Sequence, residues 1–168
     1  MSLPSLAQSL LVLGLAPAAL AIVIATDLVG RVIPNLALLV LLAGFALLAL
    51  MGAVPDLALR LLLASGVLAL GFALFAQDVI GAGDAKLGAI IALWLDPAQL
   101  PLFALICGLL GGCLVAAVTL RARWQRDRRP QRFAARMLDL APSLPYGVAL
   151  AGAALLLLPT SALVAHLA

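Results

Sequence analysis

The chain has 168 residues, of which 66% are hydrophobic and only 10% are charged, with a formal net charge of +3. Soluble domains are nearer half apolar and a quarter charged, so this composition excludes an ordinary soluble domain and indicates a membrane protein with several spans. The length leaves no room for a second domain of useful size, and we expect residues 1–168 to form one membrane-embedded domain.

Six apolar runs predict an all-α protein with about six transmembrane helices. A span needs about 20 apolar residues, which five of the runs provide, whereas the fourth is short and ends at Asp96 and Pro97. The predicted spans are 10–28, 36–54, 57–76, 85–95, 100–120 and 145–164.

The basic residues predict the orientation of these spans. Seven of the ten lie between Arg121 and Arg136, in an Arg-rich loop expected at about 121–142. With both termini outside, nine of the ten basic residues lie on the cytoplasmic side, and only Arg60 falls on an outer loop. The sequence therefore predicts an N-out, C-out protein whose Arg-rich loop contacts anionic lipid headgroups, with no role in nucleic-acid binding.

Two acidic residues in this apolar chain are candidate functional groups. Asp27 ends the first run, and Asp84 follows Gly81 and Gly83 before the fourth. An acid at membrane depth is costly and commonly functional. An out-and-back pair of spans separates the two acids, so both are expected on the cytoplasmic side. Close carboxylates share a proton, so that one can activate water while the other protonates an amide carbonyl. The two glycines would let backbone and substrate approach Asp84.

Each of these residues also has a plainer interpretation. Asp84 can cap the start of the fourth helix, and Asp27 can pair with Arg31 at a helix end. Lys86 either orients a carboxylate or anchors the helix at the inner surface. Asp78 is the main rival as second acid, although we expect it to face the cytoplasmic surface.

A few further residues are expected to have structural roles only. Asp56 and Asp96 fall on outer loops and are interpreted as solvated turn residues, and Trp94 fits an interfacial aromatic belt. Cys107 and Cys113 are six residues apart, a spacing that favours neither a zinc site nor a disulfide. No metal or cofactor is expected.

The start of the sixth span, Pro145-Tyr146-Gly147, is predicted at the same membrane level as the two acids. It either contributes to a water-accessible recess beside them or is a Pro-started helix with an interfacial Tyr. A recess is expected there because irregular Gly-rich backbone inside a membrane occurs only where protein buries it or where it lines a wet cavity.

In their order and spacing these motifs resemble the bacterial type IV prepilin peptidases, GxGD-type aspartyl proteases of the inner membrane. The resemblance rests on Asp27 with Arg31, Ile33-Pro34-Asn35, the run from Gly81 to Leu87, and Pro145-Tyr146-Gly147. It implies a multi-pass inner-membrane enzyme that cuts the short basic leader of prepilins after a Gly, at the cytoplasmic face. It also implies the catalytic pair Asp27 and Asp84, with supporting residues Gly81, Gly83, Lys86, Arg31, Pro34, Asn35, Pro145, Tyr146 and Gly147.

Larger members of that family carry a cysteine-rich insertion between the first spans and also N-methylate the new pilin N-terminus. This chain has only residues 31–35 there and none of those cysteines, which argues against methylation. Its size resembles the short peptidases of tight-adherence (Flp-type) pili. The expected partner is a Flp-type prepilin or pseudopilin, presented as an apolar helix.

Two other classes of function stay open from the sequence. One is a small transporter that uses Asp27 and Asp84 as proton or cation sites, and the other is a catalytically silent assembly protein. No inverted repeat is evident and the acids cluster on one side, which counts against a transporter. An assembly protein would tolerate the loss of either acid.

Overall fold

A computed structural model describes residues 3–126 and 146–165, which form helices joined by short connections, without a strand. The first rod comprises α1 (Leu3–Ser9), a π-helical stretch (Leu10–Leu15) and α2 (Ala16–Gly30). The wider π turns come just before Pro17, whose missing N–H and bulky ring disturb regular α-helical bonding.

The other helices follow with short connections. They are α3 (Asn35–Leu50), α4 (Leu57–Phe75), α5 (Ala82–Trp94), α6 (Leu100–Arg126), α8 (Tyr146–Leu157) and α9 (Ala162–Ala165), with 3₁₀ turns at Pro97–Gln99 and Leu158–Thr160. The predicted all-α fold class is confirmed over the described residues. Helix α6 continues to Arg126, through the first residues of the predicted Arg-rich loop, and these residues favour helix.

Among the described helices, three are long and apolar enough to cross a membrane: Ser5–Gly30, Leu57–Phe75 and Pro97–Arg121. Two shorter apolar helices, Asn35–Leu50 and Tyr146–Thr160, correspond to the second and sixth predicted spans. The total of six spans and their orientation stay predictions.

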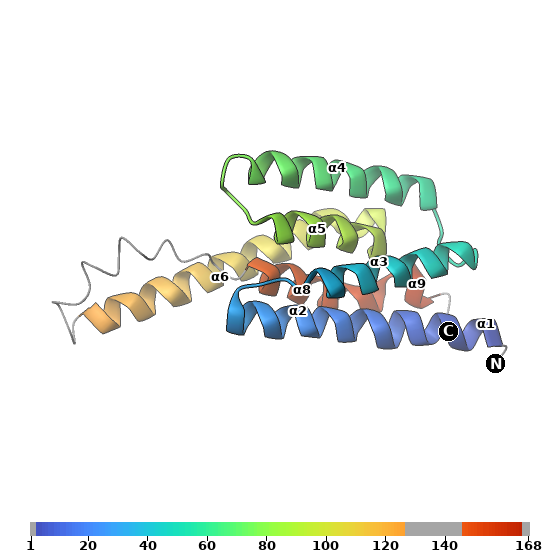
Figure 1. Ribbon diagram of the computed structural model, residues 1–168, viewed down its shortest axis with the longest axis horizontal. Coiled ribbons are helices and arrows are strands. Elements are labelled where there is room, and N and C mark those ends of the chain that lie inside the picture. The colour runs from blue at the N-terminus through green and yellow to red at the C-terminus, as the bar shows by residue number, and fades with distance from the viewer. Residues whose placement is uncertain (1–2, 127–145, 166–168) are drawn as a thin grey trace.

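The bundle is organised around α8, which packs against α2, α5 and α6, while α5 packs against both α3 and α4 (Figure 1). Small side chains allow helices to approach closely within a membrane. The buried side of α8 supplies several of them, namely Gly147, Ala149, Ala151, Ala153 and Ala154.

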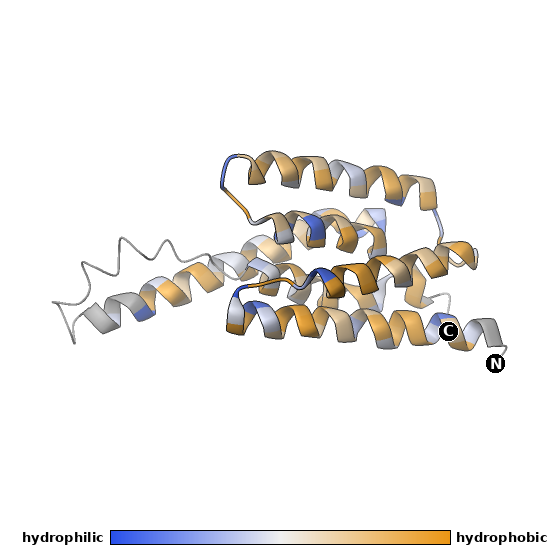
Figure 2. Cartoon of the chain, viewed as in Figure 1, coloured by the Kyte–Doolittle hydropathy of each residue, from blue (hydrophilic) through white to orange (hydrophobic). Residues whose placement is uncertain are grey.

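The α2–α3 and α4–α5 connections lie at the same end of the bundle, and α1 and α9 lie at the other (Figure 1). Most of the residues in the helices are hydrophobic, and hydrophilic residues occur in both of these connections (Figure 2). Arg31, in the left-handed conformation, ends α2, and the extended Pro34 precedes α3. The fold therefore brings the end of α2 and the start of α5 to one polar end.

At the opposite end, Arg60 and Asp96 correct the sequence-based interpretation. Arg60 lies in the first turn of α4 rather than in a loop, is 1% exposed, and pairs with the Asp96 carboxylate. Its guanidinium also donates to the carbonyl oxygens of Leu93 (3.0 Å) and Leu95 (2.7 Å). Asp96 is therefore not a solvated turn residue, because the packing of α4 on α5 buries the guanidinium and a buried charge needs such partners.

The prediction that Trp94 belongs to an interfacial belt is also wrong. Its side chain is 3% exposed, donates its indole N–H to the Leu41 carbonyl at 3.2 Å, and meets Phe45 edge to face at 6.1 Å. Trp94 is thus part of the core between α3 and α5, where its single polar atom has a partner.

Candidate functional site

Asp27 lies in the last turn of α2 and is only 5% exposed. The backbone N–H of Val148, in the first turn of α8, donates to Asp27 Oδ2 at 3.0 Å. The first N–H groups of a helix have no partner within the helix, and that end carries a partial positive charge. The start of α8 therefore holds this carboxylate in place and satisfies one of its oxygens.

Gly147 makes this approach possible. A Cβ atom at position 147 would stand 2.8 Å from Asp27 Oδ2 and 2.9 Å from Ile33 Cδ1, closer than real Cβ atoms come to other groups. Any larger side chain here would displace either the Asp27 carboxylate or the start of α8.

Asp84 lies in the first turn of α5 and is half-buried. Its Oδ2 accepts a hydrogen bond from the Gly81 N–H at 3.2 Å, and Gly81 itself is the N-cap. The plainer interpretation is thus partly right, because Asp84 does stabilise the start of α5, although from inside the helix rather than from the cap position. This hydrogen bond fixes the orientation of the side chain.

Ile33, in the α2–α3 connection, lies between the starts of α5 and α8. A Cβ at Gly83 would be 3.3 Å from Ile33 Cβ, and the Ile33 side chain also faces Gly147. Ile33 thereby spaces the two helix starts that carry or hold the aspartates. The sequence alone indicates no role for Ile33; the available signal is an apolar residue between Arg31 and Pro34 in a short polar connection.

A cavity of about 780 Å³ joins the two acids, and its lining includes both Asp27 and Asp84. The recess expected from the sequence is therefore present. The lining residues come from the α2–α3 connection, the α4–α5 connection and the helix ends beside them: Asp27, Arg31, Val32, Ile33, Asn35, Asp78, Val79, Ile80, Gly81, Ala82, Gly83, Asp84, Lys86 and Tyr146.

The predicted supporting residues are distributed unevenly around this cavity. Arg31, Asn35, Lys86 and Tyr146 line it with exposed side chains, and the two glycines that precede Asp84 line it with their backbone. Pro34 ends the connection next to it, and Gly147 contacts Asp27 from α8. Pro145 and residues 127–144, which include most of the Arg-rich loop, lie outside the described residues.

The alternative pairing of Asp27 with Arg31 is not formed. Over residues 3–126 and 146–165, the single ion pair is that of Arg60 with Asp96. Arg31 instead donates its backbone N–H to the Asp27 carbonyl at 3.0 Å, which closes the helix. The Asp27 side chain is consequently directed to α8 and the cavity.

Asp78 lies on the rim of the same cavity. Its side chain is exposed, as expected, and its backbone is in the left-handed region with φ of 56°. The described part of the chain contains no cluster of three or more His, Cys, Asp or Glu side chains that could hold a metal. Cys107 and Cys113 are both free thiols.

A comparison with known protein families matches residues 14–116, more than half of the chain, to the type IV leader peptidase family. The matched range contains both Asp27 and Asp84. No curated protein and no solved structure matches the chain.

Proposed function

This chain belongs to the type IV leader peptidase family and is therefore a protease, and from that premise we propose that Asp27 and Asp84 are its catalytic pair. The proposed reaction removes the short basic leader of a Flp-type prepilin or pseudopilin after a Gly, at the cytoplasmic face of the bacterial inner membrane. The observation that carries the proposal is that both carboxylates line one cavity.

The two carboxylates divide the chemistry of peptide hydrolysis between them. The ionised one removes a proton from a water molecule, whose oxygen attacks the carbonyl carbon of the scissile amide. The protonated one donates its proton to the carbonyl oxygen, which gives a tetrahedral diol. When the diol collapses, one of its hydroxyls gives its proton to the ionised carboxylate, the C–N bond breaks, and the leaving nitrogen takes the proton of the other carboxyl, so the pair again holds one proton. The roles belong to the pair, because coupled acids titrate together.

The hydrogen bonding of the two acids suits this task. Each uses Oδ2 to accept a backbone N–H, from Val148 for Asp27 and from Gly81 for Asp84. Each carboxylate is thus held in place by the backbone at a helix start, which is the preorganisation that catalysis rewards.

The proposed orientation places this cavity on the cytoplasmic side, where a basic leader remains after the apolar part of the substrate has inserted. The Arg-rich loop would lie on the same side, in contact with anionic headgroups. The α2–α3 connection is only a few residues long, and we propose leader cleavage without N-methylation.

A processing assay in membranes tests the assignment. A candidate Flp-type prepilin is co-expressed with the wild type or with Asp27→Asn, Asp84→Asn or Asp78→Asn, and leader removal is read by mass. Each substitution keeps the size of the side chain and removes its acid–base function. We expect Asn at position 27 or 84 to lower the cleavage rate by at least about 100-fold, and Asn at 78 to leave cleavage near wild type.

Cleavage that survives Asn at either 27 or 84 would contradict the catalytic pair. Wild-type membranes that process none of a panel of Flp-type prepilins would contradict the proposed substrate. Pilus assembly that tolerates Asn at both positions would favour the silent assembly protein instead.

A further inference from the structure

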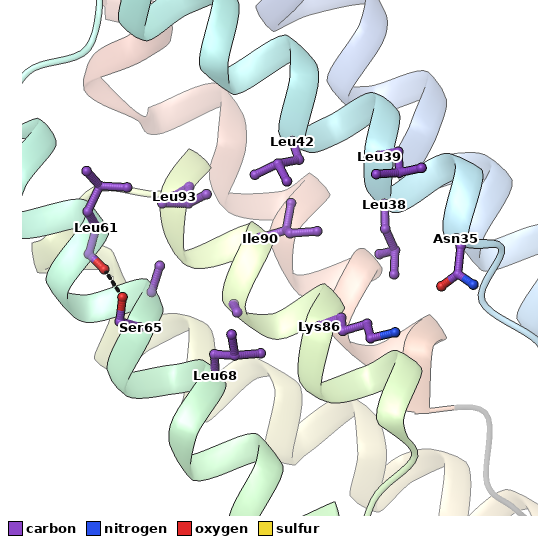
Figure 3. A pocket seen from close by; sticks show the side chains of 12 residues that line it. Asn35, Leu38, Leu39, Leu42, Leu61, Ser65, Leu68, Lys86, Ile90 and Leu93 are labelled. Atoms are coloured by element: carbon purple, nitrogen blue, oxygen red, sulfur yellow. Dashed lines mark hydrogen bonds between the residues drawn. The ribbon is translucent and has the colours of Figure 1, made fainter.

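A second hollow lies beside the acidic cavity, between α3 and α4 and over α5 (Figure 3). It has a volume of about 550 Å³. Helix α5 packs against both neighbours and forms the floor. The walls are apolar, with leucines such as Leu39, Leu42, Leu61 and Leu68. We call this hollow the leucine groove.

The leucine groove and the acidic cavity are continuous, because Asn35 and Lys86 line both. Figure 3 shows these two residues at one end of the groove, with the Lys86 side chain extended toward the end where Asn35 lies, while Leu61 and Leu93 lie at the other end. One depression therefore runs from the two aspartates, past a polar junction, into an apolar trough along three helices.

Several apolar side chains in the groove are exposed, because no other part of the described chain covers them. Leu39 is 61% exposed, Leu61 49% and Leu42 43%, and Lys86 is the only charged residue among the lining side chains. In a membrane such a surface is covered either by lipid or by another apolar helix. Its continuity with the acidic cavity distinguishes this groove from the other lipid-facing surfaces of the bundle.

Resting on the proposed function, we propose that the leucine groove is the docking site for the apolar helix of the substrate. The helix lies between α3 and α4, and its leader end reaches the two aspartates. Helix-in-groove docking uses apolar side chains on one face of the ligand helix, which the leucines suit. The groove would thus select substrates by their membrane helix and place the scissile bond.

The polar junction and the acidic cavity fit the leader end of such a ligand. Its helix must begin or unwind near the scissile bond, which leaves backbone N–H and C=O groups that need partners inside a membrane. The amide of Asn35 can both donate and accept, and Lys86 can donate. Beyond them lies the acidic cavity, in which the leader end of the ligand meets Asp27 and Asp84.

Ser65 offers a way to block the groove. Its side chain is exposed and lines the groove. Its hydroxyl donates a hydrogen bond to the Leu61 carbonyl oxygen, one turn earlier, at 2.7 Å. Ser65→Trp would fill the trough without adding atoms beside the aspartates. Leu62→Trp is the matched control, since Leu62 is on the same helix, is 68% exposed and does not line the groove.

Two substrates separate docking from catalysis. One is a Flp-type prepilin inserted in membranes, and the other is a short peptide with the same leader and cleavage site but without the apolar helix. The measured quantity is the ratio of kcat/KM for the prepilin to kcat/KM for the peptide. We expect Ser65→Trp to lower this ratio by at least about tenfold, as the loss of a docking contact does. An unchanged ratio in Ser65→Trp, equal to that of Leu62→Trp, would overturn the docking site while leaving the proposed function intact.

Cross-linking tests the groove without relying on cleavage or on the tolerance of a bulky residue. In an inactive Asp84→Asn protein lacking Cys107 and Cys113, Leu39→Cys should form a disulfide with cysteines placed along one face of the prepilin helix. Leu62→Cys should form far less. Equal adducts at both positions would overturn the proposal in favour of lipid in the groove. A wild type that cleaves neither substrate would contradict the proposed function, and the cross-links would then decide the groove alone.

Discussion

Gly147 and Asp27 are in contact across the interface of α8 with α2. A Cβ on residue 147 would stand 2.8 Å from Asp27 Oδ2, the same oxygen that accepts the Val148 N–H at 3.0 Å. The absence of a side chain at 147 is thus what lets a helix N-terminus reach a buried carboxylate. The position of the Asp27 carboxylate therefore depends on the glycine at 147, although the two residues are far apart in sequence.

Gly147→Ala is expected to lower the rate of leader removal by about 10- to 100-fold, because small misplacements of a catalytic group cost that much. The added methyl must displace either the Asp27 carboxylate or the start of α8. We also expect the free energy of unfolding to fall by about 1–3 kcal/mol from overpacking. Mass spectrometry of the prepilin in membranes and thermal unfolding in detergent measure the two effects.

Gly108→Ala is the matched control, because nothing lies within 4 Å of the Cβ it would add to α6. It should leave cleavage unchanged and raise helix stability slightly. Equal behaviour of the two variants would show that the contact between Gly147 and Asp27 does not matter for activity.

Gly71→Ala is expected to destabilise the pairing of α4 with α5. Its Cβ would come to 2.8 Å from Ala85 Cβ, next to Asp84. Overpacking of this kind costs about 1–3 kcal/mol, and it should shift the start of α5 enough to slow cleavage. Gly66→Ala on the same helix has open space around its Cβ and should be neutral or slightly stabilising. Thermal unfolding of the two variants side by side measures the difference, and a Gly71→Ala protein as stable as Gly66→Ala would refute the close contact.

The sequence was sufficient to predict the all-α class, and the presence of two acids and a recess at one end of the bundle. Charged residues are so rare in this chain that Asp27 and Asp84 were conspicuous, and counting the spans between them put both at one end. Those predictions depend only on apolar run lengths and charge positions, which are local properties. The catalytic assignment itself stays a proposal.

The pairing of Arg60 with Asp96 could not be predicted, because it depends on how α4 packs on the end of α5. Charge counting placed both residues on outer loops, where solvation is the default. The indole of Trp94 is buried by the same packing, and Ile33 acquires its role only when two helix starts close on it. These are tertiary contacts between distant segments, for which hydropathy gives no signal.

Arg60→Met is expected to destabilise the protein strongly. It leaves the Asp96 carboxylate and the carbonyls of Leu93 and Leu95 without their donor. Breaking one partner of a buried ion pair costs about 3–5 kcal/mol. The cleavage rate per folded molecule should remain near that of the wild type, since this cluster lies at the far end of the bundle from the aspartates. Thermal unfolding followed by tryptophan fluorescence measures the loss.

The double variant Arg60→Met, Asp96→Leu supplies the control for that loss. Removing both charges leaves no uncompensated ion, so it should recover part of the lost stability. A double variant less stable than Arg60→Met would show that the carboxylate has other essential partners, of which the Ala162 N–H at 2.6 Å is the first candidate.

Asp78→Gly is expected to keep cleavage and to maintain or raise stability. The backbone of Asp78 has φ of 56°, a region that costs most residues about 1–2 kcal/mol and glycine nothing. The exposed carboxylate has no hydrogen bond within the described chain, so its removal breaks no hydrogen bond of the folded protein. Asp78→Val is the opposite control and should destabilise, because a β-branched residue fits that region worst. Leader removal and thermal unfolding are measured on both. A stable Asp78→Gly protein that no longer cleaves would make Asp78 the second catalytic acid, since it lines the same cavity as Asp27, and would reduce Asp84 to the start of its helix.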